Sequence, residues 1–152
     1  MEAMSFLRTL LLGSAAAALS LQVAGCGCTM VGCESGVDVT LFVTADAPLA
    51  GSELRICVNG ACSTGAIVPD GDQLVCELEG GHRCTIAPFE DVLSVEVHVW
   101  VNEDEAEDGD QILVTLSAPD DSVLAEQGGE VVYQESEPNG AMCGPTCMNA
   151  TL

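Results

Sequence analysis

Cysteine is the residue type with the widest chemistry in this 152-residue chain, which contains nine of them. Two of them flank Asn59-Gly60, the strongest two-residue signal for a type I′ hairpin turn. Counting outward from this turn sets Cys57 directly opposite Cys62, where the short distance between neighbouring strands suits a disulfide. The sequence therefore predicts a Cys57–Cys62 bond across a hairpin.

A second cysteine pair flanks a glycine-containing turn at residues 79–81. The same outward count sets Cys76 opposite Cys84, and it also sets Glu77 opposite Arg83. Opposite charges at facing positions favour this register. We therefore expect a second hairpin with a Cys76–Cys84 disulfide across it.

Four further cysteines lie toward the two ends of the chain: Cys28, Cys33, Cys143 and Cys147. We expect Cys28 and Cys33 to form disulfides with Cys143 and Cys147, and the residues leave the pairing open. The alternatives are a four-thiolate zinc site and a redox site at 143–147. The spacings disfavour both, because each of those motifs usually has two residues between its cysteines.

Acidic side chains crowd the segment 103–110, which lies between two expected strands. Carboxylate oxygens are the ligands that Ca²⁺ requires. The candidate ligands are Glu103, Asp104, Asp108 and Asp110. The segment departs from an EF-hand loop, because Ala106 and Thr115 stand where two ligands belong. A solvated hairpin tip is the preferred interpretation, with Ca²⁺ as the alternative cofactor.

Only two histidines are present, His82 in the second turn and His98 on the outward side of an expected strand. No Gly-x-Ser-x-Gly elbow accompanies them. We therefore expect both to be surface residues, and we expect no enzyme activity.

The first 25 residues have the pattern of a signal peptide. Arg8 precedes an apolar run of about 15 residues, which is shorter than a helix that spans a bilayer. The segment Val23-Ala24-Gly25-Cys26 then resembles the lipobox of bacterial lipoproteins, in which the chain is cleaved before the cysteine and the cysteine sulfur takes a diacylglycerol. An ordinary secretory signal is the alternative.

This resemblance implies an exported protein whose residues 1–25 are removed and whose Cys26 anchors it to a membrane. Gly27, in place of Asp, implies the outer membrane of the cell envelope. Residues 26–36 would then be a short segment between the anchor and a folded domain at 37–152. Subtracting Cys26 leaves eight cysteines, an even number that suits four disulfides in an oxidising compartment.

The chain is strongly acidic, with 24 acidic residues, three basic ones and a formal net charge of −21. Such a surface repels nucleic acid and keeps a protein dispersed. We therefore expect no nucleic-acid partner, and the length suits one domain.

Alternating apolar and polar residues predict β-strands. The clearest runs are 93–101 and 112–116, and we expect these two to form the centre of the core. Further strands are expected at 37–44, 54–58, 66–68, 73–78, 83–87, 130–135 and 148–152. Eight or nine short strands without a helix indicate an all-β protein, an antiparallel β-sandwich of immunoglobulin-like architecture stapled by disulfides.

Phe42 and Trp100 fall on the outward side of two of these strands. Exposed apolar side chains on a sheet are either covered by another segment or form an interaction patch. We expect a loop to cover them, with a small binding patch as the alternative.

Both ends of the expected exported part resemble small cysteine-rich lipoproteins of myxobacteria and related bacteria. The segments that carry this resemblance are 28–33, 138–140 and 143–147. The resemblance implies a compact exported β-domain clasped by terminal disulfides, and it implies no activity. We therefore expect a non-catalytic binding or structural module of the envelope, with a protein or glycan partner. A Ca²⁺-dependent binding domain is the alternative, and an enzyme is less favoured.

Overall fold

A computed structural model describes residues 32–140 and 143–152 of the chain. The expected signal peptide, Cys26 and Cys28 lie outside these residues. The described part is all-β, as the sequence predicts, with ten strands. It contains no helix that could span a bilayer.

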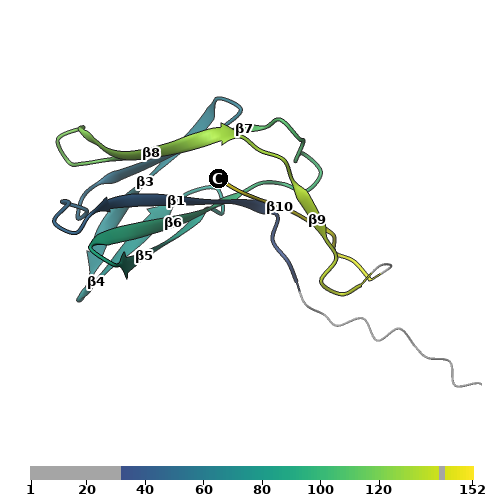
Figure 1. Ribbon diagram of the computed structural model, residues 1–152, viewed down its shortest axis with the longest axis horizontal. Coiled ribbons are helices and arrows are strands. Elements are labelled where there is room, and N and C mark those ends of the chain that lie inside the picture. Colours follow the sequence, from purple (N-terminus) through teal and green to yellow (C-terminus); the bar gives the residue numbers. More distant parts are fainter. Residues whose placement is uncertain (1–31, 141–142) are drawn as a thin grey trace, which may run out of the picture.

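The strands form two five-stranded sheets (Figure 1). The strands of sheet A, in spatial order, are β5 (Arg83–Phe89), β6 (Val92–Trp100), β1 (Gly36–Thr44), β10 (Cys147–Thr151) and β9 (Gln134–Ser136). Those of sheet B are β4 (Gln73–Leu78), β3 (Ala61–Asp70), β2 (Glu53–Val58), β7 (Gln111–Ser117) and β8 (Val123–Glu130). Neighbouring strands are antiparallel except β1 and β10, which run parallel.

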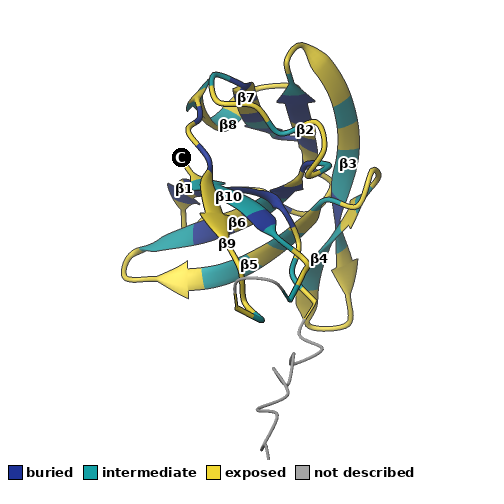
Figure 2. Cartoon of the chain, turned by 90° about the vertical axis from the view of Figure 1, so that its right-hand side faces the viewer, coloured by how far each residue is buried: buried dark blue, intermediate teal, exposed yellow. Residues whose placement is uncertain are grey.

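One hydrophobic core lies between the two sheets (Figure 2). Alternate residues of β1, β2, β6 and β7 point into it, since successive side chains of a strand face opposite sides. The expected central strands are confirmed, because six of their inward residues are at most 2% exposed. These residues are Val95, Val97, Val99, Ile112, Val114 and Leu116. Each such side chain contributes roughly 1.5–3 kcal/mol of stability.

The expected hairpin across residues 79–81 is wrong. β4 pairs with β3 and β5 pairs with β6, so β4 and β5 lie at the edges of different sheets. Gly80 and Gly81 have φ of 74° and 79° and turn the chain from sheet B to sheet A. The two observed ladders contain six and seven residue pairs, so every residue of β4 and of β5 is paired within its own sheet. Arg83 is paired with Glu34 instead of Glu77.

The acidic segment 103–110 is likewise not a hairpin tip. It leads from β6 in sheet A to β7 in sheet B, so it is a connection between the two sheets. β8 escapes the sequence prediction because the residues 126–130, Glu-Gln-Gly-Gly-Glu, show no alternation of apolar and polar side chains. Of the strand expected at 130–135, only the end belongs to β9, which pairs with β10.

Candidate functional site

The Asn59-Gly60 turn and its disulfide have the expected geometry. Asn59 and Gly60 have φ of 50° and 82°, the left-handed conformations that a type I′ turn requires. Cys57 faces Cys62 with 4.0 Å between their Cα atoms, and the two are joined. This bond lies on the outer face of sheet B.

The other disulfides connect distant parts of the fold. Cys76–Cys84 joins β4 to β5, and thus the edge of one sheet to the edge of the other. Cys33–Cys147 joins the two ends of the domain, with a sequence separation of 114. Cys143 is also disulfide-bonded. These bonds fix the two sheets and both chain ends to each other.

Asp110, one of the four candidate Ca²⁺ ligands, is buried and structural. Its carboxylate accepts hydrogen bonds from Asn59 Nδ2 at 2.8 Å, Tyr133 Oη at 3.0 Å and the Glu107 backbone N–H at 3.2 Å. Burial alone would raise the pKa of Asp110, but these three hydrogen bonds together hold it below its ordinary value of 3.8. Asp110 therefore ties the Asn59 turn to the acidic segment.

The remaining candidate ligands do not join Asp110 around a cation. Asp108 accepts a hydrogen bond from the Tyr133 backbone N–H at 2.9 Å. Glu103 and Asp104 line a separate hollow together with Glu135. Within residues 32–140 and 143–152, no group of three or more such side chains is arranged to hold a metal ion. The acidic segment thus uses two of its carboxylates to bind Asn59 and Tyr133, which lie in other parts of the chain.

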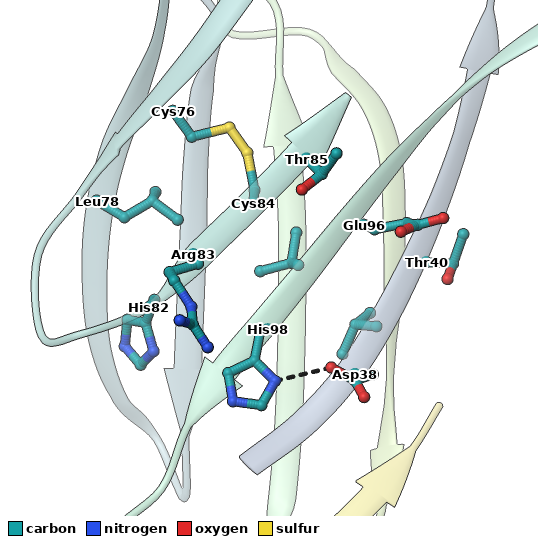
Figure 3. Close-up of a pocket in the computed structure, with 12 residues that line it drawn as sticks. Asp38, Thr40, Cys76, Leu78, His82, Arg83, Cys84, Thr85, Glu96 and His98 are labelled. Atoms are coloured by element: carbon teal, nitrogen blue, oxygen red, sulfur yellow. Dashed lines mark hydrogen bonds and ion pairs between the residues drawn. A yellow bond between two sulfur atoms is a disulfide. The ribbon is translucent and has the colours of Figure 1, made fainter. Parts of the chain in front are cut away.

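Polar side chains gather on the outer face of sheet A, the side that points away from the core. Asp38 of β1, His98 of β6 and Arg83 of β5 are direct neighbours in the ladder, and Glu96 lies in the next row. Figure 3 shows these side chains on one side of the three strands. They line a hollow of about 610 Å³ that continues to the Cys76–Cys84 bond. The hollow offers both hydrogen-bond donors and acceptors to a polar ligand.

The His98–Asp38 pair has part of the geometry of a general base. His98 Nδ1 lies 2.7 Å from Asp38 Oδ1, and the side chain of His98 is 20% exposed. Its Nε2 atom is buried and has no hydrogen-bond partner in the described part of the chain. Nε2 packs against Gly36, where an added Cβ would lie 2.7 Å away. Because a general base must reach the proton that it takes, this arrangement orients His98 without making it available to a substrate.

His82 holds the turn before β5 against the end of β6. Its Nδ1 accepts a hydrogen bond from the Trp100 backbone N–H at 3.0 Å. Burial lowers the pKa of His82 below 6.5, and nearby His98 lowers it further. The neutral imidazole is therefore the form that fits this contact.

The prediction that a loop covers Phe42 and Trp100 is wrong for both residues. Phe42 is 53% exposed and Trp100 is 44% exposed. Phe42 contacts Phe89, which is 52% exposed, with 5.5 Å between the ring centroids. The turn at Gly81 lies beside Trp100, since a Cβ added there would be 3.6 Å from Trp100 Cγ, but it leaves the ring partly exposed. The outer face of sheet A therefore has an aromatic pair at one end, Trp100 at the other and charged residues between them.

Sequence reasoning placed His98, Phe42 and Trp100 on an outward face, but it did not assemble them into one site. Strand alternation gives the side of each residue, whereas the order β5-β6-β1 is needed to make Asp38, His98 and Arg83 neighbours. No protein-family model, curated protein or solved structure matches the chain.

Proposed function

We propose that this chain is an exported bacterial lipoprotein, anchored through acyl chains of the palmitate type on Cys26, that serves as a non-catalytic binding module of the cell envelope. The observation that carries the proposal is the lipobox at 23–26 in front of a disulfide-bonded β-domain. Disulfides persist in exported proteins and are rare in reducing compartments. The outer membrane is the expected location because Gly27 follows the cysteine.

The position of Cys33 limits how far the domain could lie from a lipid on Cys26. Cys33 is joined to Cys147, so the folded domain begins there. The distance from Cys26 to Cys33 is at most about 25 Å, because an extended chain spans about 3.3–3.6 Å per residue. A lipid on Cys26 would therefore hold the domain close to the membrane, with the chain ends nearest to it.

The architecture that we propose for the domain is an immunoglobulin-like β-sandwich. Two five-stranded sheets with one common core support it. The exposed Phe42–Phe89 pair on the outer face of sheet A supports a binding role, since adjoining exposed apolar groups often mark interaction sites. The buried Nε2 of His98 supports a module without catalysis.

Mass spectrometry of the mature protein tests the anchor. The full chain is expressed in a bacterium that processes lipoproteins, beside the variant Cys26→Ala. We expect an N-terminus at Cys26 with added acyl mass, and partition into detergent that the variant loses. An unmodified Cys26 in a disulfide would instead indicate an ordinary secretory signal and would refute the anchor.

A hydrolase substrate panel tests the absence of catalysis. Asp38→Asn is the informative variant, because Asp38 orients His98 and is itself exposed. We expect no turnover from either protein. Turnover by the native protein that Asp38→Asn abolishes would make the His98–Asp38 pair catalytic and overturn this part of the proposal.

A further inference from the structure

The aromatic pair of sheet A lies at the end of the domain that is far from the expected anchor. β1 runs from Gly36, close to Cys33, to Thr44. Phe42 is six residues along this strand from Gly36, which corresponds to about 20 Å at roughly 3.3 Å per residue. Phe89 ends β5 at the same end, as its pairing with Val92 shows. The pair therefore faces away from a membrane that holds Cys26.

The loops at this distal end carry only one sign of charge. They are 45–52, 70–73, 90–91 and 118–122, and Figure 1 shows this end on the left. They contain no lysine or arginine. Their seven acidic residues are all exposed: Asp46, Asp70, Asp72, Glu90, Asp91, Asp120 and Asp121. A partner that approaches this end meets a negative field before it reaches the rings.

Phe42 and Phe89 give this end an apolar contact surface. Both rings are more than half exposed, and Ala87 and Val92 beside them are only partly buried. Between the strands that carry the two rings lies Ser94, which is 4% exposed and donates a hydrogen bond to the Ala87 carbonyl. Aromatic faces attract the cationic groups of lysine and arginine, and carboxylates strengthen that attraction. The rings and the acidic loops thus favour the same kind of ligand.

We infer that this distal surface, formed by Phe42, Phe89 and the acidic loops around them, docks a basic, partly apolar segment of a partner protein. This inference rests on the proposed binding role and names the class of partner. A second copy of the chain is disfavoured as the occupant, because two surfaces of the same negative charge repel each other. An anionic lipid surface is disfavoured for the same reason.

Peptide binding to the full, lipidated chain in detergent micelles tests this surface. The probe is a fluorescent 12-residue peptide of lysine, leucine and alanine, and its counterpart has glutamate at every lysine position. We expect the lysine peptide to bind the native chain. The double variant Phe42→Ser, Phe89→Ser should weaken its affinity at least about tenfold. The double variant Glu90→Gln, Asp91→Asn should make the affinity less dependent on salt concentration. The control Val132→Ser removes a more exposed apolar side chain elsewhere and should bind as the native chain does.

Three results would overturn the inference. The first is that the lysine peptide does not bind at concentrations up to about 1 mM. The second is that the native chain and the double phenylalanine variant bind this peptide with equal affinity. The third is that the native chain binds the glutamate peptide as tightly as the lysine peptide. Concentration-dependent dimers that the double variant loses would show that a second copy occupies the surface, which also overturns it. Circular dichroism checks that each variant is folded. We expect the phenylalanine variants to fold, because both rings are about half exposed and outside the core.

Acyl mass on Cys26, measured in the same preparation, separates this inference from the proposed function. An acylated chain that does not bind the peptide refutes the docking surface and leaves the anchor standing. An unacylated chain that binds the peptide refutes the anchor and leaves the docking surface standing.

Discussion

The Asp110 network should be the most sensitive polar site of the fold, and Asp110→Ala measures it. Asp110 is 7% exposed and accepts three hydrogen bonds, from Asn59 Nδ2, Tyr133 Oη and the Glu107 N–H. The alanine variant removes a charged acceptor and leaves these donors without their partner. Only the bond from Tyr133 Oη is buried, whereas the donors of Asn59 and Glu107 can reach water in the variant. Because an unsatisfied buried donor costs about 1–3 kcal/mol and a solvated one costs less, we expect the free energy of unfolding to fall by about 2–3 kcal/mol.

A double-mutant cycle with Tyr133→Phe tests whether the cost belongs to the network. Tyr133→Phe removes one hydrogen bond, so we expect a loss of about 1 kcal/mol. Asp110→Ala already includes this bond, and the double variant should therefore be about 1–2 kcal/mol more stable than the sum of the single losses implies. The control Asp46→Ala removes an exposed acid of the same charge and should stay within about 0.5 kcal/mol of the native chain.

Urea unfolding followed by circular dichroism, with the disulfides intact, is the assay. A shift of the midpoint at constant slope reports stability. The explanation fails if Asp110→Ala costs less than about 1 kcal/mol or if the cycle is additive within error.

The pH dependence gives the same network a second test. Hydrogen bonds hold the pKa of Asp110 in the folded state below its ordinary 3.8. Its contribution is therefore present above about pH 4 and is lost as pH falls through the folded-state pKa. The stability difference between the native chain and Asp110→Asn should shrink below about pH 4, and a difference that stays constant there would contradict the assigned charge.

Three other predictions concern separate parts of the chain. Since Cys33 is joined to Cys147, the expected terminal pairing leaves Cys28 as the partner of Cys143. Peptide mapping without reductant should recover this cross-linked pair. Recovery of Cys143 linked to Cys26 would exclude it. Acidification should protonate His82 at Nδ1, break its bond to the Trp100 N–H and change the fluorescence of the chain's single tryptophan. Because the folded-state pKa of His82 is lowered, the stability that this contact contributes is present above pH 6.5 and is lost as the pH falls from there through the folded-state pKa. A tryptophan fluorescence that does not change between pH 7 and 4 would contradict this prediction. Calorimetry with Ca²⁺ should show no binding heat because Asp108 and Asp110 are engaged in hydrogen bonds, whereas heat that Asp108→Asn removes would restore the cation-binding alternative.

Local patterns predicted the strands and the Asn59 turn, because alternation and turn chemistry act over a few residues. The same reasoning failed for the segment 79–81, where glycines and flanking cysteines are equally compatible with a hairpin and with a crossing between sheets. The Cys76–Cys84 pair was expected from a hairpin register that does not form. The bond instead connects the sheet edges.

The hydrogen bonds of Asp110 were beyond sequence reasoning for a different reason. Asn59 and Asp110 are 51 positions apart, and nothing in either neighbourhood identifies the other as its partner. Asp110 was assigned to a solvated acidic run because five of its neighbours in 103–110 share its charge. Its burial depends on how β7 begins beside the Asn59 turn, which only the assembled sheet B determines.

The parallel pairing of β1 with β10 has a consequence for biogenesis. β10 follows the nine other strands of the described residues, so this neighbour of β1 is synthesised after all of them. Sheet A therefore cannot close around β1 until β10 has been synthesised. Such distant pairing slows folding, because a long loop must be ordered before the contact is made. Until then, the edge of β1 that β10 covers has unpaired backbone N–H and C=O groups, so the unfinished domain has an open edge in sheet A.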